Sequence, residues 1–192
     1  LRLHWRSLPA LINVCGLVGT GKSTVAAMLA KEEGWQAASS DVTRKSLAGI
    51  PLTEHRFEEF DGGIYSREFS EMTYARMFDE SREVLSGGSS MIIDASFKKK
   101  EERERARKLA EETGARFLVV ECTLDEETAR LRQDQRLREG SVSDGRWEIF
   151  GQQKKDFDEI TEIPPESHMV VDTSGPVEDV ISLIIERIGG QY

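Results

Sequence analysis

The chain has 192 residues, 38% of them hydrophobic and 32% charged, and a formal net charge of −9 at pH 7. This length and composition predict a single globular domain with a sizeable core. The acidic balance argues against nucleic-acid and anionic-membrane binding, since both need a basic surface, and no apolar run is long enough to span a membrane.

The first residues, LRLHWRSLPALINVCG, carry charge and a proline where a signal peptide needs an uninterrupted apolar segment. Cys15 and Cys122 have no metal or redox spacing, and both are expected to be small buried apolar residues. These features predict reduced thiols and a cytoplasmic protein. Because the chain begins with Leu rather than Met, we also expect it to be a piece of a longer protein.

Short apolar runs that are rich in Val and Ile and bounded by turn residues are typical of buried parallel strands. Such runs occupy residues 10–15, 36–39, 90–94, 116–122 and 168–172. Helical patterns lie between them and include an apolar stripe from Tyr74 to Leu85, a charged helix over 101–112 and a last stripe from Val177 to Ile188. The alternation predicts an α/β fold with a parallel sheet covered on both faces. The segment GSVSDG, residues 140–145, is predicted to be a mobile connection within the domain.

The first predicted strand is followed by GLVGTGKS, which matches the pattern G-x-x-x-x-G-K-S between a strand and a helix. Three glycines let the backbone wrap closely around phosphate oxygens with its N–H groups pointing inward, and the next helix adds its positive end. Lys22 is suited to bridge the β- and γ-phosphates. The alternative is a glycine-rich turn that precedes a helix by chance. We predict a nucleotide site made of Gly16, Leu17, Val18, Gly19, Thr20, Gly21, Lys22, Ser23 and Thr24.

Asp94 ends the third predicted strand, MIID, where a carboxylate can hold Mg²⁺ through a water molecule. With the Ser23 hydroxyl it forms the predicted magnesium site, and ATP and Mg²⁺ are the expected cofactors. The alternative is that Asp94 merely caps the next helix. Residue 95 is Ala rather than a water-polarising Glu, which argues against a dedicated ATPase motor.

Asp41 and Arg44 follow the second predicted strand and share one face if a helix begins there. The carboxyl ends of parallel strands lie at one edge of a sheet, so we expect this pair beside the phosphate loop. Asp41 is a candidate general base for an attacking hydroxyl, and Arg44 is a candidate partner for the substrate or the transferred phosphoryl group. Alternatively, Asp41 is a helix N-cap and Arg44 is solvated, and the two roles are compatible.

Arginines recur after the fourth predicted strand, in ARLRQDQRLREGSVSDGR. Arg132 and Arg136 are four residues apart and repel each other unless an anion lies nearby. We predict a lid over about residues 130–146, with Arg132 and Arg136 closing over the triphosphate. The alternative is a solvated basic helix face. Lys98–Lys100 are expected to be solvated, the three histidines show no zinc spacing, and the three tryptophans are expected to be packing residues.

These motifs together resemble the small P-loop kinases. The segments GLVGTGKSTVAAMLA, SSDVTRKSLAGI, GIYS, MIIDASF, VVEC, SVSDGRWEIF and VVDTSGP are similar, in order and spacing, to a group of predicted kinases that occurs alone or fused behind an aminoglycoside-phosphotransferase-like domain. The resemblance runs from about Pro9 to Val180. More distantly, Asp41 and Arg44 resemble the Asp-x-x-Arg pair of phage polynucleotide kinase and the zeta toxins, where the pair acts as base and as phosphate or substrate partner.

The resemblance implies a P-loop NTPase fold of three α/β/α layers, with a five-stranded parallel sheet in the order 2-3-1-4-5 and a helical lid. The kinase-like domain then spans residues 10–192. Residues 1–9 resemble the junction after a fused domain, so they are expected to be an extension or the remnant of a linker, and a fused N-terminal domain is a candidate partner. The resemblance also brings the segment 172–176 near the adenine, which makes Thr173, Gly175 and Pro176 candidate nucleotide-binding residues.

The sequence therefore predicts a Mg²⁺-ATP-dependent phosphotransferase that moves the γ-phosphate to a hydroxyl of a small acceptor. The predicted catalytic residues are Asp41, Arg44, Lys22, Arg132 and Arg136. One alternative is an ATP-binding or ATP-hydrolysing regulatory module that serves a fused or partner kinase-like domain. Another is a nucleic-acid 5′-hydroxyl kinase, which the net charge of −9 disfavours. Residues 49–67 are expected to shape the acceptor pocket, but they do not identify the acceptor.

Overall fold

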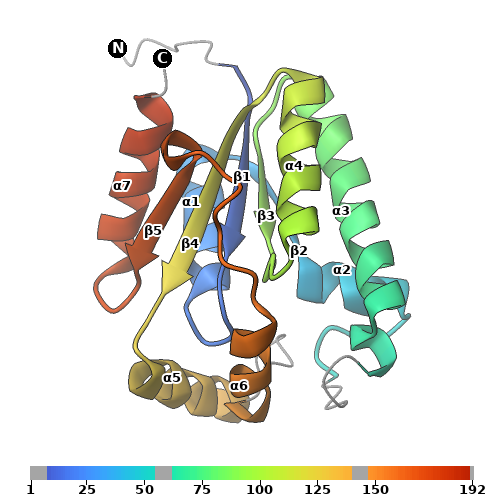
Figure 1. The fold of residues 1–192 in the computed structure, drawn as a ribbon, viewed down its shortest axis with the longest axis vertical. Coiled ribbons are helices and arrows are strands. Elements are labelled where there is room, and N and C mark those ends of the chain that lie inside the picture. Colours follow the sequence, from blue (N-terminus) through green and yellow to red (C-terminus); the bar gives the residue numbers. More distant parts are fainter. Residues whose placement is uncertain (1–7, 55–61, 140–146, 191–192) are drawn as a thin grey trace.

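Parallel strands form one sheet at the centre of the molecule, in a computed structural model that describes residues 8–54, 62–139 and 147–190 (Figure 1). Within these residues five strands lie in the order β2-β3-β1-β4-β5, as predicted, and every pairing is parallel. The strands are β1 Ala10–Cys15, β2 Gln36–Ser39, β3 Met91–Asp94, β4 Arg116–Thr123 and β5 His168–Asp172.

Helices cover both faces of the sheet, so the predicted three-layer arrangement is confirmed (Figure 1). The helices are α1 Lys22–Glu33, α2 Ser40–Leu47, α3 Arg67–Ser86, α4 Lys100–Thr113, α5 Glu126–Glu139, α6 Trp147–Asp156 and α7 Val177–Gly189, with short 3-10 turns η1 Gly63–Tyr65 and η2 Pro165–Ser167. In the part of the chain that the structure describes, no helix is both long and apolar enough to cross a bilayer.

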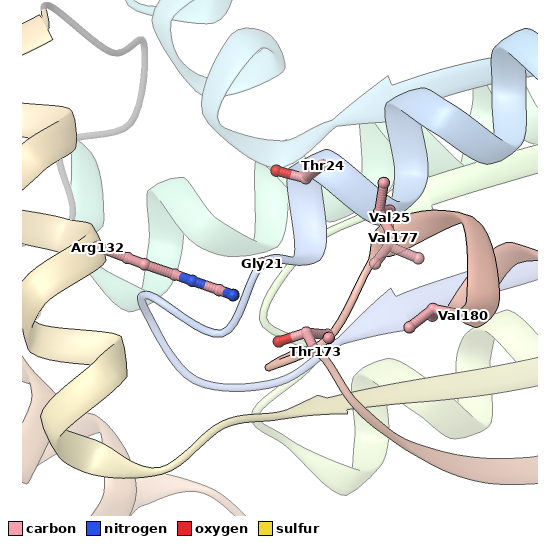
Figure 2. A pocket seen from close by; sticks show the side chains of 8 residues that line it. Gly21, Thr24, Val25, Arg132, Thr173, Val177 and Val180 are labelled. Atoms are coloured by element: carbon pink, nitrogen blue, oxygen red, sulfur yellow. The ribbon is translucent and has the colours of Figure 1, made fainter.

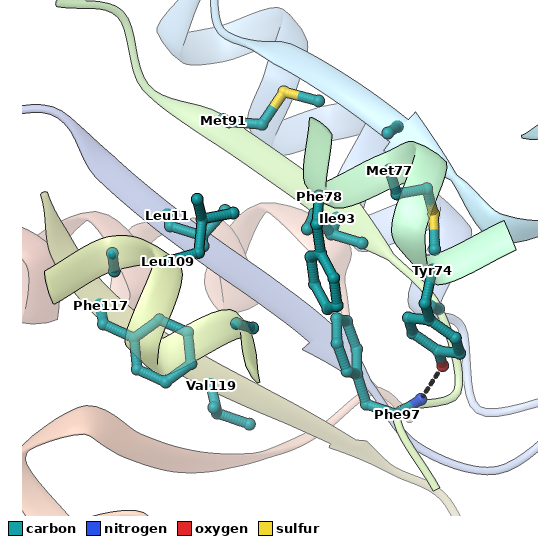
Figure 3. Packing of buried hydrophobic residues seen from close by; sticks show 14 of the residues in the cluster. Leu11, Tyr74, Met77, Phe78, Met91, Ile93, Phe97, Leu109, Phe117 and Val119 are labelled. Carbon is teal, nitrogen blue, oxygen red and sulfur yellow. Dashed lines mark hydrogen bonds between the residues drawn. The ribbon is translucent and has the colours of Figure 1, made fainter. Parts of the chain in front are cut away.

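The strand side chains alternate between two cores, because successive residues of a strand point to opposite faces. On one face, Leu11 and Ile93 pack with Tyr74 and Met77 of α3 and Leu109 of α4 (Figure 3). The Tyr74 hydroxyl accepts a hydrogen bond from the Phe97 N–H at 3.0 Å, so even the polar atom of this buried ring is satisfied.

The opposite core joins the sheet to α1 and α7. The predicted last stripe is confirmed in α7, whose buried residues are Val180, Ile181, Ile184 and Ile188. Pro176 precedes this helix and Glu178 and Asp179 lie in its first turn, where acids suit the positive end of the helix dipole.

The strand boundaries differ slightly from those predicted. The third strand begins at Met91 rather than Ser90, whose hydroxyl instead accepts the Ala10 N–H at 3.0 Å, and the fourth strand continues to Thr123. The predicted mobile connection, residues 140–145, and residues 1–7 of the predicted extension lie outside the described residues.

The register brings the carboxyl ends of the strands to one edge of the sheet. Val14 pairs with Asp94, Asp94 with Ser39, and Thr123 with Asp172. The loop after β1, the start of α2 and the pair α5 and α6 all follow from this edge (Figure 1). The predicted functional residues are therefore gathered at one end of the molecule.

A candidate nucleotide site with an adjoining acceptor side

The loop from Gly16 to Gly21 joins β1 to α1 and needs glycine at three positions. Gly16, Gly19 and Gly21 have φ angles of 133°, 81° and 83°, in the region that favours glycine. A Cβ on Gly16 would lie 2.4 Å from the Cys122 carbonyl oxygen, and one on Gly19 would lie 2.9 Å from the Ala129 carbonyl oxygen. The loop is therefore packed tightly between the end of β4 and helix α5.

Side chains of the loop and of the segment after β5 hold this backbone in place. The Thr20 hydroxyl and the Lys22 ammonium both donate to the Leu17 carbonyl oxygen at 2.7 Å. The buried Thr173 hydroxyl donates to the Thr20 carbonyl oxygen at 2.8 Å. Thr173, predicted to bind nucleotide, thus fixes the shape of the phosphate loop.

Helix α1 presents its positive end to the edge of the sheet. Its N-cap is Gly21, which has no side-chain capping bond, and its first turn contains no acidic residue. Ser23 and Thr24 are exposed on this first turn. A glycine loop that leads into such a helix start is a favourable place for phosphate oxygens.

A cavity of about 150 Å³ opens beside this helix start (Figure 2). Its wall combines the apolar side chains Val25, Val177 and Val180 with the polar Thr24, Thr173 and Arg132, and it also includes Gly21 and Gly175. An apolar wall with a few polar groups is typical of sites for a small ligand such as a nucleobase. The predicted residues Thr173 and Gly175 line the cavity, whereas Pro176 lies outside this lining as the N-cap of α7.

Asp94 is 7% exposed at the end of β3, beside the end of β1. The alternative that Asp94 caps the following helix is wrong, because the N-cap of α4 is Lys99, whose backbone N–H donates to the Glu102 carboxylate at 3.2 Å. In the described ranges no three or more His, Cys, Asp or Glu side chains are grouped to hold a metal. The Ser23 hydroxyl and the Asp94 carboxylate are nevertheless hard oxygen donors, and they fit Mg²⁺, which uses few protein ligands and takes others from phosphate and water.

Asp41 lies in the first turn of α2 and is half-buried. The alternative that Asp41 is the N-cap is wrong, since α2 begins at Ser40 and its N-cap is Ser39. Because Ser39 pairs with Asp94, α2 begins beside the strand end that carries the candidate metal ligand.

Arg44 is 7% exposed, so the alternative that it is solvated is also wrong. Its Nη1 donates to the Ile64 carbonyl oxygen at 2.7 Å and to the Ser70 hydroxyl at 3.1 Å. Its Cζ lies 4.8 Å from the centre of the Tyr65 ring, and its buried Nε has no hydrogen-bond partner among the described residues. Arg44 therefore ties α2 to the segment after it and keeps one buried donor unused.

Lys45, which the sequence reasoning missed, is 1% exposed next to Arg44, and its ammonium donates to the Leu52 carbonyl oxygen at 3.2 Å. The predicted pocket segment, residues 49–67, thus meets α2 at Leu52 and Ile64, while residues 55–61 lie outside the described residues.

The arginines of α5 differ in where they point. Arg132 is half-buried and reaches toward the phosphate loop, with its Nη1 3.7 Å from the place of a Cβ on Gly21 (Figure 2). Arg132 is therefore only partly solvated. Arg136 lies on the same helix, but its side chain is outside the described part of the structure. Arg130 instead lies over Trp147, with Cζ 6.0 Å from the ring centre, and Trp147 stacks on Phe150 as a packing residue.

Several contacts of α6 were not predicted. The Gln153 side-chain oxygen accepts the Val18 N–H at 2.6 Å, and a lone glutamine 135 positions away carries no recognisable sequence signal. Lys98 and Lys99 form ion pairs with Asp156 at 2.6 Å, so the prediction that Lys98–Lys100 are solvated is wrong for these two. Burial opposes ionisation of Asp156, but its bonds to the two lysines hold its pKa below the ordinary value.

The two cysteines are buried and free, as predicted. Burial is the main reason that the pKa of the Cys15 thiol lies far above its ordinary value and that the pKa of Cys122 is raised to about 12. Both thiols are consequently protonated at neutral pH and serve as packing groups.

The loop, the parallel sheet order and the helices α5 and α6 over the phosphate loop define the class as a kinase-like P-loop nucleotide-binding fold. Residues 11–160 match the family model described as an AAA domain, and the chain belongs to that family. The predicted P-loop kinase-like resemblance is confirmed at this level.

Sequence relatives include an uncharacterized protein of Mycobacterium tuberculosis, which is 32% identical over 113 residues, 59% of this chain. The match covers 23% of that relative, so the chain spans about a quarter of its length. A shikimate kinase of Moorella thermoacetica is 28% identical over 86 residues, which are 45% of this chain and 49% of the relative.

Solved structures of kinases share the fold across nearly the whole chain. A gluconokinase of Sinorhizobium meliloti has a TM-score of 0.65 at 19% identity, covering 95% of this chain and 93% of its own. The Mycobacterium tuberculosis APS kinase CysC, in complex with AMPPNP and APS, has a TM-score of 0.64 at 17% identity, covering 95% and 98%. At these identities the structural likeness concerns the fold alone.

Proposed function

We propose that the protein is a Mg²⁺-ATP-dependent phosphotransferase that transfers the γ-phosphate to a hydroxyl group of a small molecule. The observation that carries the proposal is the pairing of Ser39 with Asp94, because it starts the helix of Asp41 beside the strand end of the candidate metal ligand. A site that only binds nucleotide needs no further carboxylate there. The kinases among the relatives and fold neighbours support the same class of reaction.

The nucleotide is held by the phosphate loop and the start of α1. Loop N–H groups and Lys22 bind phosphate oxygens, and the cavity beside Val177 and Val180 receives the base. Ser23 and Asp94 would hold Mg²⁺, which when bound neutralises charge on the phosphates. Arg132, which reaches toward the same loop, adds a cation where negative charge develops.

Asp41 acts on the acceptor. Its carboxylate takes the proton of the acceptor hydroxyl as that oxygen bonds to the γ-phosphorus. The bond from the γ-phosphorus to the β–γ bridging oxygen breaks, and its electron pair leaves with ADP. The Nε of the buried Arg44, which has no partner in the described part of the chain, helps to orient an anionic group of the substrate or the phosphoryl group in transit.

The experiment is a search for the acceptor in two stages. Metabolites are screened for thermal stabilisation of the protein in the presence of Mg²⁺ and a non-hydrolysable ATP analogue, and each hit is then tested for acceptor-dependent ADP release. A phosphorylated product formed in equal amount to ADP is expected. Tight binding of the analogue with no acceptor-dependent ADP release by any hit would instead favour a regulatory nucleotide-binding module. A labelled oligonucleotide serves as the test for nucleic-acid kinase activity.

A further inference from the structure

Helices α5 and α6 rest on the phosphate loop at three places. The Ala129 carbonyl of α5 abuts Gly19, the Arg132 guanidinium of α5 approaches Gly21, and the Gln153 side chain of α6 accepts the Val18 N–H at 2.6 Å. Of these three contacts, only the one between Gln153 and the Val18 N–H is a hydrogen bond, and a hydrogen bond fixes direction as well as distance. Gln133, on the same face of α5 as Ala129 and Arg132, is 3% exposed, and among the described residues its amide has no hydrogen-bond partner.

The peptide group between Leu17 and Val18 shows which side of the loop Gln153 holds. Its carbonyl end accepts the Lys22 ammonium at 2.7 Å. The described backbone has no cis peptide bond, and in a trans peptide the N–H points away from the carbonyl. The Val18 N–H therefore faces away from Lys22, the residue that reaches the phosphates. Gln153 consequently holds the outer side of the loop, and its bond is compatible with a bound nucleotide.

The two helices are also tied to each other. The Lys154 ammonium of α6, next to Gln153, forms an ion pair with Glu126 at the start of α5. The Arg130 guanidinium of α5 lies over the ring of Trp147 in α6. A contact that fixes α6 on the loop therefore also restrains α5, which carries Arg132.

We propose that Gln153 is a positioning residue for the phosphoryl transfer. Its bond to the Val18 N–H fixes α6, and through α6 the helix α5, so that the Arg132 guanidinium lies over the phosphate loop. The inference rests on the function proposed above, and it adds a residue that acts through Arg132 without touching the substrate.

The test compares three variants. Gln153→Met keeps an unbranched side chain of similar length but removes the acceptor oxygen, whereas Gln153→Glu keeps an acceptor. Gln152→Met makes the first change at the exposed neighbouring position of α6. We expect Gln153→Met to lower kcat for ATP hydrolysis on the order of 10-fold, because small displacements of positioned groups are costly, with a much smaller change in affinity for a non-hydrolysable ATP analogue. Gln153→Glu should restore most of kcat, and Gln152→Met should behave as wild type.

A double variant separates a positioning role of Gln153 from a general role in supporting the fold. In an Arg132→Ala background, Gln153→Met should lower kcat no further, since the group that it positions is gone. A further loss by the same factor as in the wild type would overturn the inference.

A second measurement, the quenching of tryptophan fluorescence, does not depend on catalytic turnover. With Trp5 and Trp35 replaced by Phe, Trp147 reports the docking of α6, and Gln153→Met should raise its quenching by acrylamide while Gln152→Met does not. Unchanged quenching in Gln153→Met would overturn the inference about Gln153. The proposed function would still stand in that case if the wild type showed acceptor-dependent ADP release. Increased quenching together with neither ATP hydrolysis nor acceptor-dependent ADP release by the wild type would overturn the proposed function and the catalytic role of Gln153, and would leave only the docking contact.

Discussion

Among the described residues two arginines, Arg44 and Arg103, are buried, and the charge of their partners differs. Arg103 of α4 is 0% exposed and binds the Glu162 carboxylate through Nε at 2.5 Å and Nη2 at 3.2 Å. Arg44 of α2 is 7% exposed, and the partners that the structure gives it are a carbonyl, a hydroxyl and an aromatic ring. The protein neutralises the charge of Arg103 with a carboxylate, whereas the contacts that the described residues make with the Arg44 guanidinium come from groups without charge.

The difference separates a structural arginine from a candidate functional one. A buried charge is costly unless it is paired, so Arg103 and Glu162 make a stable link between α4 and the chain that follows α6. Arg44 lies beside Asp41 on the acceptor side, and a nearby anion would complete its surroundings. Burial alone would have ranked the two arginines together, whereas the charge of their partners separates them.

The largest effect is expected on stability, from removing Arg103 from its pair with Glu162. Arg103→Met leaves Glu162 buried without its partner and should lower the free energy of unfolding by about 3–5 kcal/mol. Urea denaturation measures the change. Replacing Glu162 by Leu as well should recover much of the loss, because a buried ion pair exchanged for apolar groups costs little. Arg44→Met leaves no carboxylate behind in the described structure and should cost clearly less, so equal losses would contradict the comparison.

The next largest effect is expected on catalysis, from Asp41 on the helix that carries Arg44. Asp41→Asn keeps the size of the side chain but removes the base, and it should lower acceptor phosphorylation on the order of 10²-fold or more. Affinity for Mg²⁺-ATP should hardly change, as measured by calorimetry on the same preparation. Asp79→Asn, an exposed position of α3, is the matched control. Loss of ATP binding in step with activity would place Asp41 in the metal site instead.

Local sequence patterns were sufficient for the strands and for the glycine loop, whereas the order of the strands in the sheet came from the resemblance to small P-loop kinases. Apolar runs and the glycine motif depend on neighbouring residues, so they predicted the strands, the sheet edge and the loop around Gly16 and Gly21. Ile64 lies 20 positions from Arg44, Glu162 lies 59 from Arg103 and Val18 lies 135 from Gln153, and nothing in the local pattern specifies these pairs. The same limit explains the error at Lys98 and Lys99, whose acidic partners Asp156 and Asp158 lie at the end of α6 and just after it.

A smaller effect is expected from Arg132, which is half-buried and free to approach an anion over the phosphate loop. Arg132→Ala should lower turnover on the order of 10-fold, and more than it lowers ATP affinity, because a preorganised cation acts most on charge that develops in transit. Steady-state kinetics and calorimetry measure the two effects. Arg107→Ala, at a partly exposed position of α4 outside the site, should change neither. Equal losses in turnover and affinity would argue that Arg132 only binds nucleotide.

The smallest effect is a pH dependence that only the paired arginine should produce. Burial would raise the pKa of Glu162, but the hydrogen bond and charge of Arg103 outweigh it and hold that pKa below its ordinary value of 4.5. The unfolded chain therefore binds a proton at Glu162 more readily than the folded chain does. This contribution to stability is fully present above about pH 4.5 and is lost as the pH falls through the lower pKa of the folded state. The unfolding free energies of wild type and Glu162→Gln should accordingly converge on acidification below pH 4.5. Glu112→Gln, which breaks a surface pair with Arg82, should show little change at any pH, and a gap for Glu162→Gln that stays constant down to pH 3 would contradict this account of the Arg103 pair.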